Sequence, residues 1–362
     1  MRVVSFAILS ICLAATLASG LSSGQSVAVP LPSSCPARAA AVGGVPVTWH
    51  QGRAGEAAEL EQWCLAVGGP IFVQAAAPAP AAAPLDELVV VTWNVHLAEG
   101  RLVDLMAGLR AGAFTSGRPV KHFVLLLQEL YRGGPDVPAF MPGARTAFAI
   151  LPRNPKATDA RSYAASLGLS VLYVPSMRNG AELLEDRGNA IVSTEPLLDP
   201  LALELPLERQ RRVAISTAIE VTIDRRPSRL ELFNAHLEPL SSPQSLWIFR
   251  NPRLPQARAI LDLLKRPRFD NRGASVGTVL GGDFNIVQRG INEEAYQESR
   301  AWSTSLASEN QRNTHAMGRI DHLFFRLDEG WTARTERLDN RFGSDHYPVL
   351  GRFSYKAKSG TP

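Results

Sequence analysis

The sequence predicts a layered α/β fold, with two β-sheets at the centre and helices on the outside. Apolar runs of strand length recur between residues 87 and 355, and segments with apolar residues at helical spacing lie between them. No internal repeat of fixed period is present, which excludes a solenoid or a propeller. The composition agrees with a globular protein, because 45% of the residues are hydrophobic and 20% are charged.

The expected strands are mostly continuous apolar runs, and several of them show two-residue alternation. They are residues 87–95, 122–130, 166–175, 188–194, 211–223, 228–237, 275–284, 318–327 and 346–355. The expected helices are residues 101–110, 257–265 and 292–302. The last of these is expected to begin at Asn292, a favoured N-cap residue, with acidic residues in its first turn.

The chain divides into five stretches by composition. Residues 1–24 have the layout of a secretory signal peptide, because Arg2 is followed by an uncharged apolar run and then by small residues. The other stretches are a small N-terminal segment (25–74), an Ala/Pro linker (75–84), the main domain (85–356) and a tail (357–362). We therefore expect a secreted or periplasmic protein.

Two cysteines, Cys35 and Cys64, remain after the expected removal of the signal peptide. In an oxidising compartment they can form a disulfide. Two separate thiols are the alternative, because pairing does not follow from sequence alone.

Polar side chains stand at the ends of several expected strands, where an apolar core does not favour them. They are Asn94, Gln128, Glu129, His236, Asp283, Asn285 and Asp321, and Asp345 and His346 begin the final strand. An unpaired buried charge is very costly, so a single such residue indicates a cap, a turn or a hydrogen-bonded core group. A whole set at comparable strand ends predicts one shared site along an edge of the sheets.

The residue types of this set point to metal-assisted hydrolysis. Carboxylate and carboxamide oxygens suit a hard cation such as Mg²⁺ or Mn²⁺. The sequence contains no phosphate-binding P-loop motif and no dense Cys/His cluster of the kind that binds structural zinc. Acids around a hard cation, with imidazoles nearby, suit hydrolysis of a phosphate ester.

Six motifs, in this order, resemble those of the endonuclease/exonuclease/phosphatase superfamily. They are TWNVH, LLLQE, NAHLEP, GGDFNI, RIDHLFF and GSDHYPV. The resemblance covers about residues 85–356. The deoxyribonuclease-like and sphingomyelinase-like members of this superfamily are metal-dependent phosphoesterases. It implies a four-layer α/β sandwich of two facing, mainly antiparallel sheets flanked by helices, with the site at one end.

The resemblance implies three metal-site residues. Glu129 corresponds to the principal metal ligand, Asn94 to its neighbour at the metal and phosphate, and Asp345 to a further acid. The implied cofactor is Mg²⁺ or Mn²⁺.

The resemblance also implies the catalytic residues. Asp283 and Asn285 correspond to the pair that orients or deprotonates the attacking water and contacts the phosphate. Being two positions apart in an extended chain, they are expected to point to the same side, and the preceding double glycine is expected to let the backbone come close. His346 corresponds to the catalytic histidine, Asp321 to the carboxylate that orients it, and His236 to the second histidine.

One departure concerns the partner of His236. Deoxyribonuclease-like members have a glutamate there, whereas Gly188 and Asn189 occupy the matching stretch of this chain. Glu185 or Asp186 is the candidate substitute.

The substrate-binding residues that we expect are Arg132 and Asn189. The cluster of Arg209, Arg211 and Arg212 can also bind phosphate as bidentate forks. A solvated charged turn is the alternative for these arginines.

We therefore expect a secreted, divalent-metal-dependent phosphoesterase that cleaves phosphodiesters by in-line attack of water. Nucleic acid is slightly favoured as substrate, since the net charge is +4 and the isoelectric point is about 9.1. The alternatives are a lipid phosphodiesterase of the phospholipase C or sphingomyelinase type, which would act on membrane lipid, a phosphomonoesterase, and a non-catalytic binding module. A monomer is expected.

Overall fold

The computed structural model describes residues 47–75, 82–139, 143–147, 159–239, 251–266, 275–287, 293–304 and 306–355. The expected signal peptide, Cys35, Asn292 and the tail lie outside these residues, so export and the disulfide stay predictions. Cys64 is described and is buried. Among the described segments, no helix has the length and apolar character needed to cross a bilayer.

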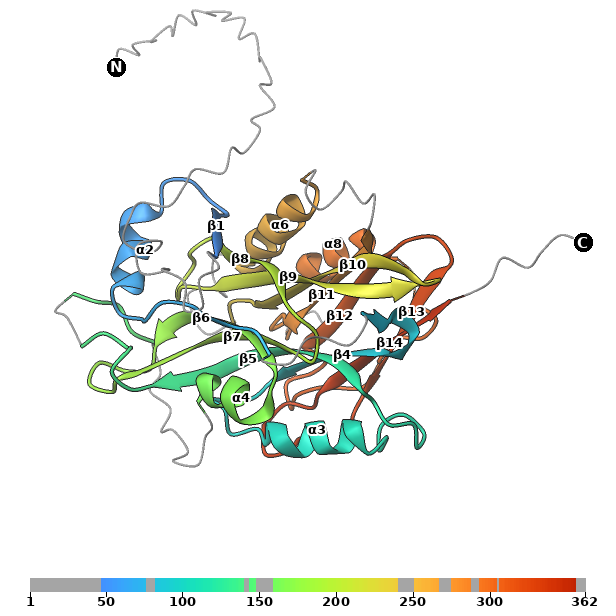
Figure 1. Cartoon of the computed structure of the whole chain (residues 1–362). Helices are drawn as coiled ribbons and strands as arrows, with labels where there is room; N and C mark the ends of the chain where they lie inside the picture. Colours follow the sequence, from blue (N-terminus) through green and yellow to red (C-terminus); the bar gives the residue numbers. More distant parts are fainter. Residues whose placement is uncertain are drawn as a thin grey trace, which may run out of the picture.

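Two seven-stranded sheets form the centre of the molecule (Figure 1). The first sheet runs β1 (Thr48–Gln51), β8 (Leu198–Glu204), β9 (Val213–Ile223), β10 (Arg226–His236), β11 (Ser275–Asp283) and β12 (Asp321–Leu327), with β3 (Ala83–Pro84) beside β9. The second runs β13 (Trp331–Arg337), β14 (Val349–Tyr355), β4 (Leu88–Asn94), β5 (His122–Gly133), β7 (Glu185–Ser193), β6 (Ser170–Arg178) and β2 (Ile71–Val73). Most strand pairings are antiparallel, as expected, and β4–β5 and β10–β11 are among the parallel ones.

Helices cover the outer face of each sheet, which makes four layers (Figure 1). They are α3 (Leu102–Arg110) and α4 (Ala160–Leu167) on the second sheet, and α6 (Arg253–Leu264) and α8 (Glu294–Trp302) on the first. One apolar cluster lies between the two sheets and one lies under each helical layer. The expected four-layer α/β sandwich is therefore confirmed.

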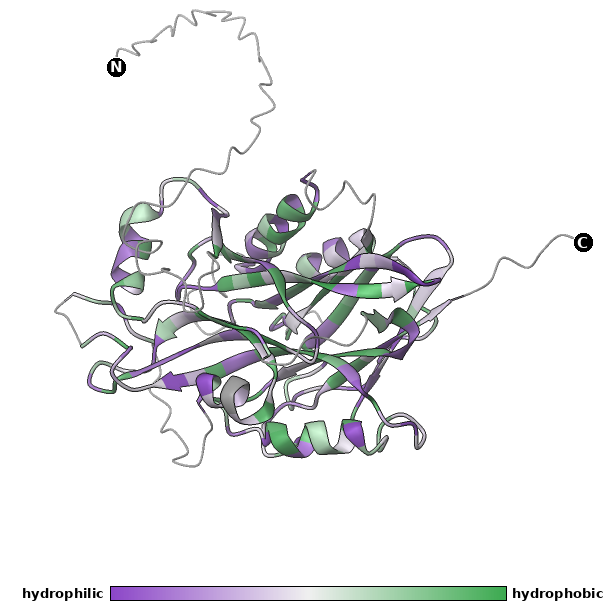
Figure 2. Cartoon of the chain, viewed as in Figure 1, coloured by the Kyte–Doolittle hydropathy of each residue, from purple (hydrophilic) through white to green (hydrophobic). Residues whose placement is uncertain are grey.

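The continuous apolar character of the central strands follows from these layers. In β4, Leu88 and Val90 face the core between the sheets, while Val89, Val91 and Trp93 face the core under α3. Successive side chains of a strand point to opposite faces, so a strand buried on both sides needs apolar residues at every position. Figure 2 shows the hydrophobic colouring running along the strands inside the sandwich.

The described part of the N-terminal segment completes both sheets. Its strand β1 pairs with β8 at the edge of the first sheet, and β2 pairs with β6 at the edge of the second. Between them, α2 (Ala57–Cys64) buries Leu60 and Trp63. The last two residues of the Ala/Pro linker form β3.

Some elements differ from the expectation. The strand expected at 166–175 begins only at Ser170, because 160–167 form α4. Asp159 caps this helix by accepting a hydrogen bond from the Arg161 N–H, and Gly168 ends it with a left-handed φ of 62°. The sequence does not predict the strands β8 and β13, because neither has a long apolar run.

The double glycine before Asp283 permits a close approach of backbones. A Cβ on Gly282 would lie 1.9 Å from the carbonyl oxygen of Ala235 on β10, and its φ is +151°. A Cβ on Gly281 would lie 2.6 Å from Leu126 of the facing sheet. The two positions therefore let β11 lie close to β10 and to the opposite sheet.

We predict that Gly282→Ala lowers the free energy of unfolding by about 3 kcal/mol, because the added methyl group collides with backbone rather than with a movable side chain. Gly117→Ala is the matched control, since Gly117 also has positive φ but has open space around its Cβ position. That variant should lose only about 1 kcal/mol. Chemical denaturation of both proteins measures the difference, and equal losses would contradict the collision.

Candidate active site

Three neighbouring strands of the first sheet place polar side chains in one row. His236 at the end of β10 pairs in register with Asp283 at the end of β11, and Asp283 pairs with Asp321 at the start of β12. Residues in register on adjacent strands project from the same face of a sheet. All three are buried.

The second sheet contributes Asn94 and Glu129. Asn94 ends β4 in register with Gln128 of β5, and a bulge between Leu127 and Leu130 interrupts the pairing of β5 with β7. Glu129 lies in this bulge with a φ of +56°. A bulge re-aims a side chain that a regular strand would place elsewhere, so Glu129 owes its orientation to this irregularity.

Asn94 connects the two groups across the sandwich. Its Nδ2 donates to Asp283 Oδ2 at 3.0 Å and to Glu129 Oε1 at 3.4 Å. Its Oδ1 accepts from the backbone N–H of His96. The expected convergence of Asn94, Glu129 and Asp283 from distant parts of the chain is therefore observed.

Beneath this cluster, two buried amides join the sheets. Gln128 Nε2 donates to Asn234 Oδ1 at 2.7 Å. Asn234 Nδ2 donates to the carbonyl oxygens of Leu127 at 2.7 Å and Ala190 at 2.8 Å. Asn234 is absent from the sequence prediction, although it stands two residues before His236 and thus on the same face of β10.

His346 reaches the cluster from the loop before β14. Its Nδ1 lies 2.8 Å from Asp321 Oδ2, and its Nε2 lies 3.9 Å from Asp283 Oδ2. The loop is held against β4, because Trp93 Nε1 donates to the His346 carbonyl oxygen and Ser344 Oγ donates to that of Asn94. The serine of the GSDH motif thus positions the histidine.

The three central ionisable groups titrate far apart. Burial lowers the pKa of His346, but the adjacent Asp321 outweighs it and raises the pKa to about 10. Burial raises the pKa of Glu129, but positive neighbours, Arg187 first, lower it to about 2. Burial and then the charge of Asp321 raise the pKa of Asp283 to about 7.

Asn285 does not continue the strand as expected. The strand ends at Asp283, whose Oδ1 accepts a hydrogen bond from the Asn285 N–H, and Asn285 has a φ of +52°. Its Nδ2 donates to the Leu237 carbonyl oxygen. The extended geometry expected for this pair is therefore wrong, because a side-chain-capped turn replaces it.

Asp345 lies at the more exposed rim of the cluster, with 41% of its side chain accessible. It is 3.3 Å from His96, 3.4 Å from His315 and 3.7 Å from His346. His315, which the sequence prediction lacks, packs its ring against that of His346 with centroids 4.6 Å apart. No spacing signal connects His315 to Asp345, since the two meet only through folding.

Two sets of side chains in the described part of the chain have ligand atoms close enough to hold a metal ion. One set is His315, Asp345 and His346, and the other is Asp283, Asp321 and His346. Glu129, the expected principal ligand, is in neither set and joins the cluster through Asn94. Its role at a metal stays a prediction.

His236 lies 3.5 Å from Asp283, and no glutamate of the described segments forms an ion pair with it. Asp186 instead accepts hydrogen bonds from Arg132 and Tyr173, and Glu185 accepts one from Asn179. Burial, followed by the charge of Arg212, holds the pKa of His236 well below its ordinary value. His236 is therefore a neutral imidazole at pH 7.

The structure separates the two expected substrate-binding residues. Arg132 is buried in an ion pair with Asp186 and does not line the pocket beside the cluster, so its guanidinium is committed to the fold. Asn189 does line that pocket, while its Nδ2 donates to the Val213 carbonyl oxygen at 2.6 Å. Arg187, which the sequence prediction lacks, lines it as well.

The arginines at 211 and 212 are not in a solvated turn. Arg211 is buried against Glu204 and the carbonyl oxygens of Pro175 and Ser176. Arg212 is buried and lines the pocket with Arg187.

A family model described as the endonuclease/exonuclease/phosphatase family matches residues 91–346. A search of curated proteins finds no significant match. The chain is similar to a solved endonuclease/exonuclease/phosphatase from Bacteroides vulgatus, with 11% identity and a TM-score of 0.46 over 74% of this chain and 98% of that one. It is also similar to sphingomyelinase C from Streptomyces griseocarneus, with 16% identity and a TM-score of 0.43 over 73% and 98%.

The family match and the site together define the class of protein, which is that of the metal-dependent phosphoesterases. Because the matching model spans well over half of the sequence, the chain belongs to the endonuclease/exonuclease/phosphatase family.

We predict that Asp321→Asn returns the pKa of His346 from about 10 toward its ordinary value of 6.5. A histidine with a raised folded-state pKa contributes stability that is complete below pH 6.5 and is lost as the pH rises toward 10. The variant should therefore be about 3 kcal/mol less stable than the wild type at pH 6, and this loss should be smaller above pH 10. NMR titration of the His346 ring in metal-free protein, with denaturation at each pH, tests this. An unchanged titration would contradict the pairing.

Proposed function

We propose that the protein is a divalent-metal-dependent phosphodiesterase in which water attacks phosphorus in line. The observation that carries this proposal is the single hydrogen-bonded cluster that joins Asn94, Glu129 and Asp283 beside the His346–Asp321 ion pair. It combines a permanently charged carboxylate, a carboxyl that titrates near neutrality and a charged imidazole. Metal-assisted hydrolysis of a phosphate ester can use a group of each kind.

The chemistry of the donor set fits Mg²⁺ or Mn²⁺. Glu129 Oε2 is buried and has no hydrogen-bond partner among the described residues, and the low pKa of Glu129 keeps the group ionised. We propose that Glu129, Asn94 and Asp345 hold the cation through oxygen atoms. When bound, the cation would neutralise the negative charge that builds on the phosphoryl oxygens.

The remaining residues act on water and phosphate. Asp283, with a pKa of about 7, is suited to accept a proton from water at neutral pH, and we assign Asn285 to contact the phosphate. His346 is positively charged at that pH and can stabilise a phosphoryl oxygen or protonate the leaving group. His236, being neutral, can accept a hydrogen bond but carries no charge to the site.

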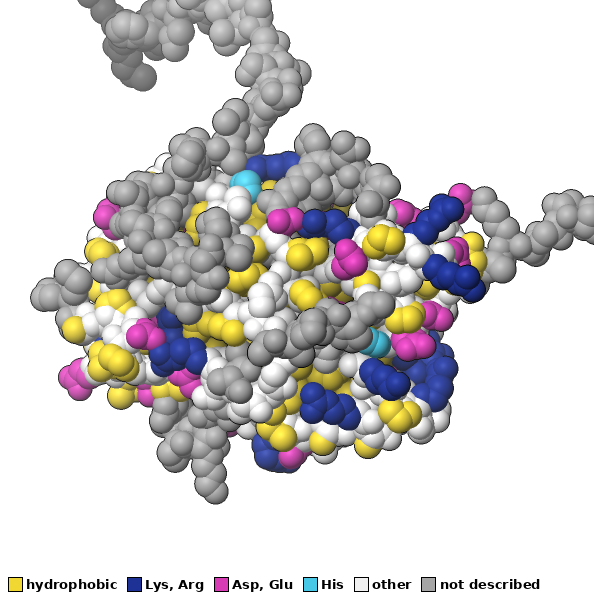
Figure 3. Space-filling model, viewed as in Figure 1, with side chains coloured by type: hydrophobic (Ala, Val, Ile, Leu, Met, Phe, Trp, Pro, Cys, Tyr) yellow, Lys and Arg dark blue, Asp and Glu magenta, His cyan; other side chains and the backbone are white. Residues whose placement is uncertain are grey.

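The net charge and the N-terminal sequence bear on the substrate class and the location of the protein. A phosphodiester of nucleic acid is slightly favoured by the net charge of +4, and a lipid phosphodiester or a phosphomonoester is the alternative. The face in Figure 3 carries acidic and basic side chains interspersed rather than one basic patch. Export rests on the signal-peptide layout of residues 1–24, and cell fractionation of the expressed chain tests it.

We predict that Glu129→Gln, or EDTA, lowers kcat/KM at least about 100-fold, because the permanently charged metal-site carboxylate or the metal is lost. Purified protein is assayed with Mg²⁺ on plasmid DNA, sphingomyelin vesicles and a chromogenic phosphodiester. Glu298→Gln is the matched control, because Glu298 pairs with Arg258 on the exposed helical layer. A folded protein that leaves every substrate intact with metal present favours the binding module.

We predict that His346→Ala lowers kcat about 1,000-fold and changes KM little, because its charge acts on the transition state. Steady-state kinetics on the best substrate of the panel separate the two constants. A loss confined to KM would assign His346 to substrate binding instead.

A further inference from the structure

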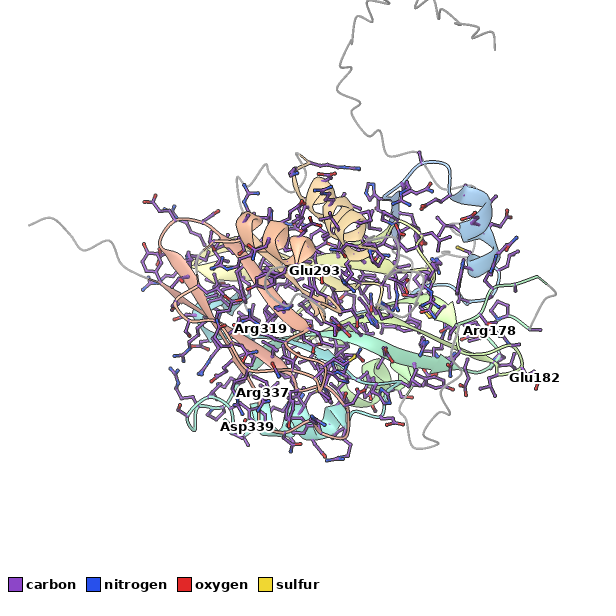
Figure 4. The ribbon with its side chains drawn as sticks, turned by 180° about the vertical axis from the view of Figure 1, so that it is seen from behind. Arg178, Glu182, Glu293, Arg319, Arg337 and Asp339 are labelled. Atoms are coloured by element: carbon purple, nitrogen blue, oxygen red, sulfur yellow. The ribbon has the colours of Figure 1, made fainter. Side chains whose placement is uncertain are left out.

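A pocket opens directly beside the cluster, where β6, β7 and the start of β9 meet the end of β10. Its walls include Glu129, Arg187, Asn189, Arg212 and His236. The hairpin between β6 and β7, marked by Arg178 and Glu182 in Figure 4, extends from the same two strands. The proposed mechanism uses Glu129 and His236 but neither of the arginines.

Arg212 is a buried cation whose hydrogen-bonding capacity is not filled. Its residue exposure is 5%, its Nη2 donates to Gln210 Oε1 at 3.2 Å, and its Nε is buried without a hydrogen-bond partner in the described chain. The nearby carboxylate oxygen of Glu238 is 3.9 Å from that Nε, which is beyond hydrogen-bond distance. Leaving a buried guanidinium N–H unpaired is costly, so the position favours an acceptor supplied from outside the chain.

Arg187 is held in the same way. Its Nη1 lies 3.9 Å from Glu129 Oε2, again too far for a hydrogen bond, and only 11% of its side chain is exposed. Asn189 lines the same pocket, but its buried Oδ1 without a partner in the described residues is an acceptor and does not suit a phosphate oxygen. The donors with unused capacity in this pocket are therefore those of the two arginines.

The charged side chains that line the pocket give it an excess of positive charge. Two of them are guanidinium groups, Arg187 and Arg212, whereas Glu129 is the one carboxylate among the described lining residues. A positive group of a substrate, such as a choline head group, would be repelled here.

We propose that Arg187 and Arg212 form an anion subsite next to the reacting phosphate, and that the substrate is a phosphodiester carrying a second phosphate adjacent to the cleaved one. This inference rests on the proposed function. It identifies the substrate class as a polyanionic chain of nucleic-acid type rather than a phosphocholine lipid. Planar guanidinium forks recognise phosphate oxygens in pairs, which suits them to this task.

The experiment compares matched substrates and variants. Deoxydinucleotides with and without a terminal phosphate, pTpT, TpTp and TpT, are assayed together with p-nitrophenyl phosphorylcholine. Wild-type protein should prefer one of the phosphorylated dinucleotides over TpT at least tenfold in kcat/KM. Arg212→Gln and Arg187→Gln should each remove most of this preference, mainly through KM, while Arg212→Lys keeps part of it.

Arg258→Gln is the matched control, since it removes the same charge from an exposed ion pair on α6 and should preserve the preference. Thermal unfolding of each variant identifies any that fails to fold. If one of the two arginine variants does not fold, the other still tests the subsite. Equal losses on TpT and on the phosphorylated dinucleotides would overturn the subsite. A preference of the wild-type protein for the phosphorylcholine ester would overturn it as well.

A binding measurement separates failure of the subsite from failure of the proposed function. If folded wild-type protein cleaves none of these esters with metal present, the phosphodiesterase proposal fails. Calorimetric titration with inorganic pyrophosphate then tests the subsite by itself. The expected result is binding to wild type that weakens at least tenfold in Arg212→Gln and Arg187→Gln, and no binding to wild type would overturn the subsite.

Discussion

The candidate site depends on the amide contact between Gln128 and Asn234, which joins the two sheets inside the sandwich. Asn234 uses its oxygen and its amide group in three hydrogen bonds, all of them to the opposite sheet. Glu129 follows Gln128 directly, and His236 stands two residues after Asn234. A slip of either strand by one residue would break buried hydrogen bonds and turn these side chains to the other face. The contact therefore fixes the register of both sheets at the site.

A small volume holds ionisable groups with very different proton affinities because each has different neighbours. Glu129 faces two arginines and titrates at about 2, whereas Asp283 faces Asp321 and titrates at about 7. Desolvation raises the pKa of both carboxyl groups, so it does not by itself distinguish them. Glu129 has the lower pKa of the two because the arginines lie on its side of the cluster. This asymmetry gives one carboxylate a permanent charge and leaves the other able to exchange a proton.

The parts of this structure that depend on local pattern can be predicted from sequence. The strands β4, β5 and β11 follow from continuous apolar runs, and the polar residues at their ends predict a shared site. The roles of Glu129 and His346 rest on resemblance in motif order. The bulge at Glu129, by contrast, depends on how β5 meets β7, and no residue in LLLQE signals it. Arg187 and His315 acquire their surroundings only from segments distant in the chain, so pattern reading passes over them.

Two arginines that the sequence marks as candidates for phosphate binding illustrate the same limit. Arg132 and Arg212 are alike in sequence terms, since each stands at one end of an expected strand. Burial gives them opposite roles, because Arg132 has a carboxylate within hydrogen-bond distance and Arg212 does not. The tertiary structure decides whether a buried arginine is used by the fold, because it determines which partner lies within hydrogen-bond distance of the guanidinium.

The strands β1 and β2 have a consequence for the integrity of the molecule. They border β8 and β6, one in each sheet, so the segment before the Ala/Pro linker shields the rim of both. A version of the chain trimmed to begin at Leu85 would leave two hydrogen-bonding ladders open to water. Open ladders of this kind recruit strands from other molecules. The stretch ahead of the linker thus covers one edge of each sheet against pairing with strands of another molecule.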